Sequence, residues 1–147
     1  MNTRKLDNLA WLPNLVARLT VGFMFASGAV GKLGRLGAFT EEFHQLGIPV
    51  PGFAAPAVAV VELAGGLALM LGIGTRLAAA LLAATMAGAL ATAIVPPLLA
   101  RYPDAWNFPS NLFYAPEWLL ICLLAWLVCA GAGKASLDAV LARRQRW

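Results

Sequence analysis

Four long apolar stretches constrain the fold of this sequence more than any other feature. They cover residues 12–31, 53–73, 77–98 and 114–131, and each is close to the roughly 20 residues that an α-helix needs to cross a bilayer. Charged residues make up only 12% of the chain, whereas they make up about a quarter of a soluble domain. The sequence therefore predicts an all-α integral membrane protein. We expect residues 1–147 to form one domain, a left-handed bundle of four transmembrane helices.

The connections between the stretches carry signals that begin and end helices. Gly72 and Gly74 are expected to break the second helix, and Thr75 is suited to cap the free N–H groups of the third. The second and third spans should therefore form a tight antiparallel hairpin. Pro96 and Pro97 predict the end of the third helix.

Residues 35–47, "RLGAFTEEFHQLG", repeat their apolar side chains at helical spacing, with the polar side chains largely on the other faces. The apolar positions are Leu36, Phe39, Phe43 and Leu46. This pattern predicts a short helix that lies in the membrane interface between the first and second spans.

The distribution of Lys and Arg predicts the orientation. If both termini are cytoplasmic, eight basic residues lie on the inner side, namely Arg4, Lys5, Arg18, Arg76, Lys134, Arg143, Arg144 and Arg146. Three lie on the outer side: Lys32, Arg35 and Arg101. Cytoplasmic loops carry the excess of Lys and Arg, so both termini are predicted in the cytoplasm. The net charge of +4 then reflects topology, and without an aromatic-and-basic motif no nucleic-acid partner is expected.

Glu62 lies inside the apolar run "AVAVVELAGGLALMLG", where a charge is costly. It shares a helix face with small residues that allow close helix approach, namely Ala55, Ala59, Gly65 and Gly66. Glu62 should therefore face a protein neighbour. The first span carries Arg18 and Lys32 on one face, and Arg18 lies only about 6 Å from the depth of Glu62. We expect a buried ion pair or hydrogen-bonded pair between Arg18 and Glu62.

The fourth span begins with another acid, Glu117, for which Lys32 and His44 are candidate partners. The segment before it carries five aromatic residues: Tyr102, Trp106, Phe108, Phe113 and Tyr114. These are typical of an interfacial aromatic belt, and they could also cap the outer mouth of the bundle.

Histidine and cysteine limit the cofactor chemistry. His44 is the single histidine, so neither a bis-His haem nor a His-rich metal site is expected within one chain. Cys122 and Cys129 share a helix face but should stand about 10 Å apart along its axis, too far for a mutual disulfide. They are interpreted as packing residues, and a redox pair would need a partner from another chain.

Four stretches in order resemble the DoxX family of small four-helix bacterial membrane proteins. They are "RLTVGFMFASGAVGKL" (18–33), "VVELAGGLALMLGIGTRLAA" (60–79), "PEWLL" (116–120) and "GAGKASLD" (131–138). By position, the resemblance marks Arg18, Lys32, Glu62, Arg76 and Glu117. The family takes its name from the small subunit of a thiosulfate:quinone oxidoreductase. The resemblance implies a multi-pass protein of the bacterial cytoplasmic membrane that is a quinone-linked or redox-associated subunit.

The leading functional hypothesis is therefore an isoprenoid quinone site in the outer half of the bundle. It would use Lys32, Glu62 and Glu117, with Trp106 and Phe108 as a lid. Lysine can donate hydrogen bonds to a quinone carbonyl, and a protonatable glutamate can supply a proton. The alternatives are a non-catalytic scaffold or assembly partner, whose charges fix helix register, and a small-solute or proton transporter. The expected partners are the lipid bilayer and either a redox-enzyme subunit or further copies of the chain.

Overall fold

The structure is a computed structural model that describes residues 11–144, with side chains to residue 141. Within this range the chain is helical and contains no strand. Three continuous helical segments are long and apolar enough to cross a membrane: α2 (Trp11–Gly34), α4 (Pro51–Leu71) and the run Thr75–Arg101. Four shorter helices complete the described residues: α3 (Leu36–Gln45) after α2, α7 (Asn107–Phe113) and α8 (Pro116–Ala130) after the third segment, and α9 (Leu137–Arg144) at the end. The predicted membrane fold is thereby confirmed in its helical class.

The third span continues through the two prolines that were expected to end it. It consists of α5 (Thr75–Ala89), the π-helix η1 (Leu90–Ile94) and α6 (Val95–Arg101). Pro96 and Pro97 lie in the first turn of α6, where a missing N–H group costs little. In an α-helix, the missing N–H groups of Pro96 and Pro97 would leave the carbonyls of Thr92 and Ala93 without donors. Both residues lie inside the wider π turn. The prediction that the helix ends at this position is wrong. The helix continues because the π turn accommodates the change in the register of the backbone hydrogen bonds.

The fourth apolar stretch, predicted as one span over residues 114–131, forms α8 (Pro116–Ala130). A further helix, α7 (Asn107–Phe113), precedes it and meets it at 61°. Ala115 is extended (φ −66°, ψ 129°) because it precedes Pro116. The 15 residues of α8 fall short of the roughly 20 that a span needs. Residues 11–144 therefore contain three candidate spans, or four if α7 and α8 together make one broken span.

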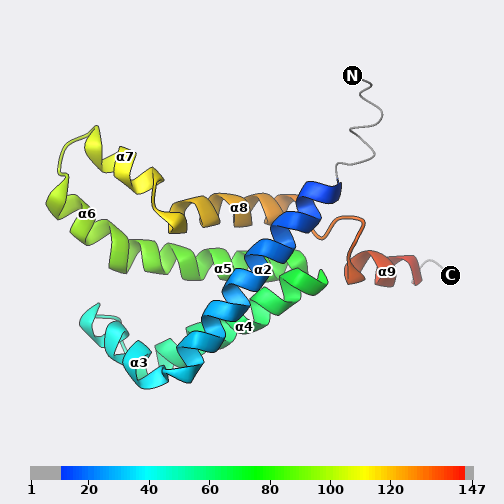
Figure 1. Cartoon of the computed structure of the whole chain (residues 1–147), viewed down its shortest axis with the longest axis horizontal. Coiled ribbons are helices and arrows are strands. Elements are labelled where there is room, and N and C mark those ends of the chain that lie inside the picture. Colours follow the sequence, from blue (N-terminus) through cyan, green and yellow to red (C-terminus); the bar gives the residue numbers. More distant parts are fainter. Residues whose placement is uncertain (1–10, 145–147) are drawn as a thin grey trace.

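The helices pack as two pairs (Figure 1). Helix α2 packs chiefly against α4 and helix α5 against α8, and α4 and α5 join the pairs. The pairs converge where the α4–α5 turn and the α8–α9 loop (residues 131–136) lie, which we call the loop end. They separate toward the end that carries α3, α6 and α7, the α3 end. The larger core cluster joins all four helices and consists of Val21, Phe25, Leu69, Ala78, Ala79, Leu82, Leu124 and Leu127.

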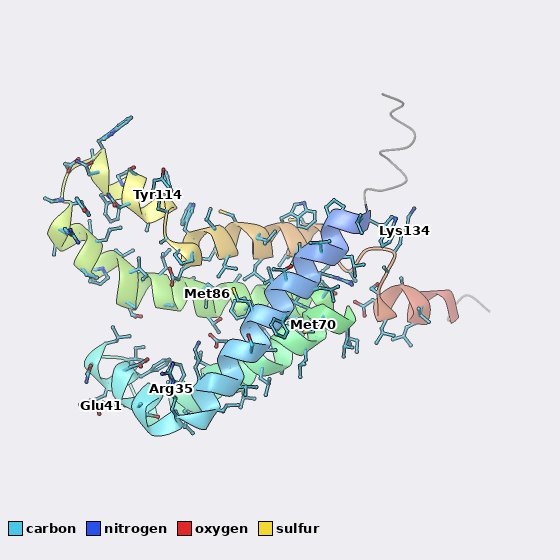
Figure 2. The ribbon with its side chains drawn as sticks, in the orientation of Figure 1. Arg35, Glu41, Met70, Met86, Tyr114 and Lys134 are labelled. Carbon is cyan, nitrogen blue, oxygen red and sulfur yellow. The ribbon has the colours of Figure 1, made fainter. Side chains whose placement is uncertain are left out.

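Glycines allow α2 and α4 to approach closely. A Cβ atom added to Gly66 would lie 2.6 Å from the carbonyl oxygen of Gly22 and 2.7 Å from the nitrogen of Ala26. One added to Gly22 would lie 2.7 Å from Cγ of Met70, which Figure 2 shows beside α2. On the neighbouring face, Gly65 contacts Leu82 of α5. The prediction that this face of residues 53–73 packs against protein is confirmed.

The helix predicted within residues 35–47 forms as α3. Its Phe39 is buried against Ala55 and Ala59 of α4 in a second, smaller core cluster. The position of α3 in the interface stays a prediction. So does the orientation of the termini, for which Arg4, Lys5 and Arg146 lie outside the described residues.

Candidate functional site

Lys32 of α2 and Glu62 of α4 form an ion pair where α2, α3 and α4 meet. Lys32 Nζ lies 2.5 Å from Glu62 Oε2, and the side chains are 30% and 3% exposed. The ammonium also lies 5.1 Å from the ring centroid of Phe39 on α3, close enough for a cation–π attraction. The pair thus combines a buried carboxylate with a cation that is still partly accessible.

Arg18 does not pair with Glu62, and this prediction is wrong. Its buried guanidinium donates hydrogen bonds to the backbone carbonyls of Ala132 and Ala135 in the α8–α9 loop. The reason is the direction of helical side chains, which lean toward the N-terminus of their own helix. On α2 this direction takes Arg18 toward the loop end and Lys32 back toward Glu62. Glu62 leans toward the start of α4 and so meets Lys32.

The loop end is held by further hydrogen bonds to the segment "GAGKASLD". Asn14 Nδ2 donates to the carbonyl of Gly131 over 3.1 Å. The carboxylate of Asp138 accepts the N–H of Gly74 at 3.0 Å and that of Thr75 at 3.4 Å. Asp138 therefore caps the N-terminus of α5, the role predicted for Thr75. The hydroxyl of Thr75 is buried and has no hydrogen-bond partner among the described residues.

Glu117 stands in the first turn of α8, where a negative charge interacts favourably with the helix dipole. Its Oε2 atom is buried and has no hydrogen-bond partner within residues 11–141. Lys32 is paired with Glu62 instead, and His44 is exposed on α3. The structure thus supports neither of the partners predicted for Glu117.

The two aromatic residues predicted as a lid lie on and beside α7. Trp106 is 83% exposed, so it covers no part of the bundle and does not act as a lid in this structure. Phe108 is partly buried in α7, which packs on α6 and α8. Cys122 and Cys129 are both exposed on α8 and are free thiols.

Asp104 organises the start of α7. It accepts hydrogen bonds from the backbone N–H of Asn107 at 2.8 Å, from the Asn107 side-chain amide at 3.1 Å, and from the backbone N–H of Trp106 at 3.1 Å. These bonds, the one from the Asn107 backbone first, hold the pKa of the exposed Asp104 carboxyl below its usual value.

Comparison with protein families identifies the chain. The DoxX family model matches residues 14–95, more than half of the sequence. The chain belongs to the DoxX family. A relative from Mycobacterium tuberculosis, described as "uncharacterized membrane protein Rv3486", is 33% identical over 135 residues. The alignment covers 86% of this chain and 80% of the relative. No solved structure matches the chain.

The DoxX match contains the Lys32–Glu62 pair as well as Arg18 and Arg76. Glu117 and the carbonyls that Arg18 binds lie beyond it. Within this DoxX protein the buried carboxylate of Glu62 on α4 pairs with the ammonium of Lys32 on α2, and that ammonium can donate hydrogen bonds. Helical faces alone could predict that the side chains of Lys32 and Glu62 point inward. To choose between Arg18 and Lys32 as the partner of Glu62, the direction in which each side chain leans along its helix is also needed.

Proposed function

We propose that this DoxX-family protein is a redox-associated membrane subunit that binds the head group of an isoprenoid quinone at the Lys32–Glu62 pair. One observation supports this function above all: the Lys32 side chain remains 30% exposed although its counter-ion is buried. An ammonium has three N–H donors, and Glu62 accepts one of them. The others remain available to a carbonyl oxygen that approaches from the lipid.

The residues around the pair fit such a ligand. A quinone takes up two electrons and two protons when it is reduced to the quinol, and a partner enzyme would supply the electrons. Lys32 would hold a carbonyl oxygen by a hydrogen bond, Phe39 would flank the head group, and Glu62 would hold a proton beside it. The exposed side chains of Val30 and Phe53 near this end offer an apolar surface to the isoprenoid tail.

The proposed setting is the cytoplasmic membrane of a bacterium, with both termini in the cytoplasm. The Lys and Arg distribution supports this orientation, and it places the loop end on the inner side. Helix α3 would then lie in the outer interface, with Phe39 against α4 and its acidic residues toward water.

Quinone binding is tested on the purified full-length protein in nanodiscs, with short-tail ubiquinone and menaquinone analogues. Glu62→Gln keeps the shape of the side chain and removes its charge, and Lys32→Met removes the donor. We expect each change to weaken binding about tenfold or more, because hydrogen bonds to charged groups are involved. Glu42→Gln, the same exchange at an exposed position of α3, is the matched control and should bind as the unaltered protein does.

Equal affinity in all four proteins would contradict the quinone site. The scaffold function would then be favoured, because the ion pair joins α2 to α4 and can serve helix register alone. Proton flux in proteoliposomes that stops with Glu62→Gln would instead favour transport.

A further inference from the structure

A groove lies at the loop end, away from the Lys32–Glu62 pair. An open groove of about 530 Å³ lies between the first turn of α5 and the α8–α9 loop. Thr75, Arg76 and Leu77 line one side, and Gly131 and Asp138 lie on the other. Since α4 and α5 are both candidate spans, the turn that joins them marks a membrane surface. The groove therefore opens at the level of lipid head groups.

Two polar side chains of the groove have hydrogen-bonding capacity that the protein does not use. Thr75 is only 1% exposed, and its hydroxyl has no partner among the described residues, which is costly for a buried polar group. The exposed Arg76 makes one long hydrogen bond, 3.5 Å from Nη2 to the carbonyl of Cys129. A guanidinium has five N–H donors, so most of them remain available.

The acidic residue in the groove, Asp138, already accepts hydrogen bonds from the protein itself. Both carboxylate oxygens of Asp138 accept backbone N–H groups, those of Gly74 and Thr75. Arg76 thus remains the charged group that faces the groove without a carboxylate partner within residues 11–141. An anion is the ligand that this arrangement favours.

An apolar surface continues from the groove along the membrane span. Leu77 lines the groove and is 67% exposed, and Leu81, one turn further along α5, is 45% exposed. Residues four apart lie on one helix face, so this surface runs from the membrane surface into the apolar layer. A ligand with an anionic head and an acyl chain matches both parts.

We propose that the groove binds the phosphate of an anionic phospholipid, with Arg76 as its principal contact. The guanidinium holds the phosphate by paired hydrogen bonds, and the Thr75 hydroxyl donates a hydrogen bond to a phosphate oxygen. One acyl chain lies along Leu77 and Leu81. This site is independent of the proposed quinone function.

The test is native mass spectrometry of the full-length protein titrated with phosphatidylglycerol, with phosphatidylcholine and with inorganic phosphate. We expect phosphatidylglycerol to bind in preference to phosphatidylcholine. Arg76→Gln should weaken phosphatidylglycerol binding about tenfold, the loss expected for one charged hydrogen-bonding group. Arg101→Gln, the same exchange at the other end of the same span, is the matched control and should leave binding unchanged.

Thr75→Val separates binding from folding. The change replaces an unpartnered hydroxyl by a methyl group of similar shape, so the protein should keep its melting temperature while its lipid affinity falls several-fold. Equal losses in Arg76→Gln and Arg101→Gln would overturn the site in favour of general charge attraction. Full competition by inorganic phosphate would overturn the lipid and favour a free anion. Unchanged affinity in both Arg76→Gln and Thr75→Val would overturn the proposal altogether.

Discussion

At the scale of single residues, the two cations of α2 have different partners although they share one helix face. Lys32 bonds a carboxylate, and Arg18 bonds two backbone carbonyls of the α8–α9 loop. Helical periodicity correctly predicted that Glu62 faces inward, because small residues surround it on that face. The partner of Glu62 was not predictable from depth alone, because Arg18 and Lys32 lean in the same direction along α2. The loop whose carbonyls accept hydrogen bonds from Arg18 is more than one hundred residues away in sequence, and no local sequence pattern predicts this contact.

A double-mutant cycle distinguishes these two cations. We expect Lys32→Met and Glu62→Gln to couple by about 1 kcal/mol or more, since the residues touch. Arg18→Met and Glu62→Gln should be additive within about 0.5 kcal/mol. Arg18→Met alone should destabilise the protein by about 1–3 kcal/mol, because it removes the two hydrogen bonds that the buried guanidinium donates to the carbonyls of Ala132 and Ala135. The measurement is reversible unfolding in detergent, and strong coupling between Arg18 and Glu62 would contradict the geometry.

The start of α7 should depend on pH through Asp104. Its pKa is lowered in the folded protein from 3.8, so the stabilising contribution is present above that value. It is lost as the pH falls through the lower folded-state pKa. We expect the backbone amide signals of Trp106 and Asn107 to shift in NMR spectra below pH 3.8. In Asp104→Asn this acid transition should disappear, and a transition that persists would assign it to another group.

At the scale of elements, prolines have two outcomes in this chain. Pro96 and Pro97 are accommodated by a π turn, whereas Pro116 begins a new helix at 61° to the preceding one. A rule that ends helices at proline predicts neither result fully, because the neighbouring turn decides whether the helix continues. The glycine pair Gly72 and Gly74 was more informative. Both residues adopt positive φ, 68° and 53°, and they form the predicted hairpin turn.

The contact between α2 and α4 is tested by adding a single methyl group. Gly66→Ala places Cβ against the backbone of Gly22 and Ala26, so the helices must separate. We expect a loss of about 1–3 kcal/mol of stability, as for other overpacked cores. Gly28→Ala is the matched control on α2, where no atom lies within 4 Å. It should be neutral or stabilise by up to about 1 kcal/mol through helix propensity. Equal melting temperatures of the two variants would contradict the close packing.

At the scale of the whole molecule, the position of the two ends of the described chain constrains the number of membrane crossings. Trp11 of α2 and Lys134 of the α8–α9 loop line one small pocket, and Figure 2 shows Lys134 beside the start of α2. Both ends of the described chain thus lie at the loop end, which requires an even number of crossings. This favours α7 and α8 as a fourth, broken span. Hydropathy predicted the number of apolar stretches, but the bend depends on the conformation of Ala115 before Pro116.

Reporter fusions test this topology. A reporter enzyme that is active only outside the cytoplasm should be inactive when fused after residue 147. It should be active when inserted in the connection between α6 and α7. The proposed orientation requires both results. Activity of the C-terminal fusion would overturn the cytoplasmic termini, and the same result at both positions would contradict the fourth crossing.

The cap on α5 has a consequence for the order of assembly during synthesis. At the start of α5, the N–H groups of Gly74 and Thr75 donate to Asp138, which the ribosome adds 63 residues after Thr75. Until then, the α4–α5 hairpin inserts with an incomplete helix start at the membrane surface, where water can serve its donors. The same late segment supplies the carbonyls for Arg18, which is inserted with the first span. Arg18 in the first span and the start of α5 therefore complete these hydrogen bonds at the same stage, after the segment that contains Ala132, Ala135 and Asp138 has been synthesised.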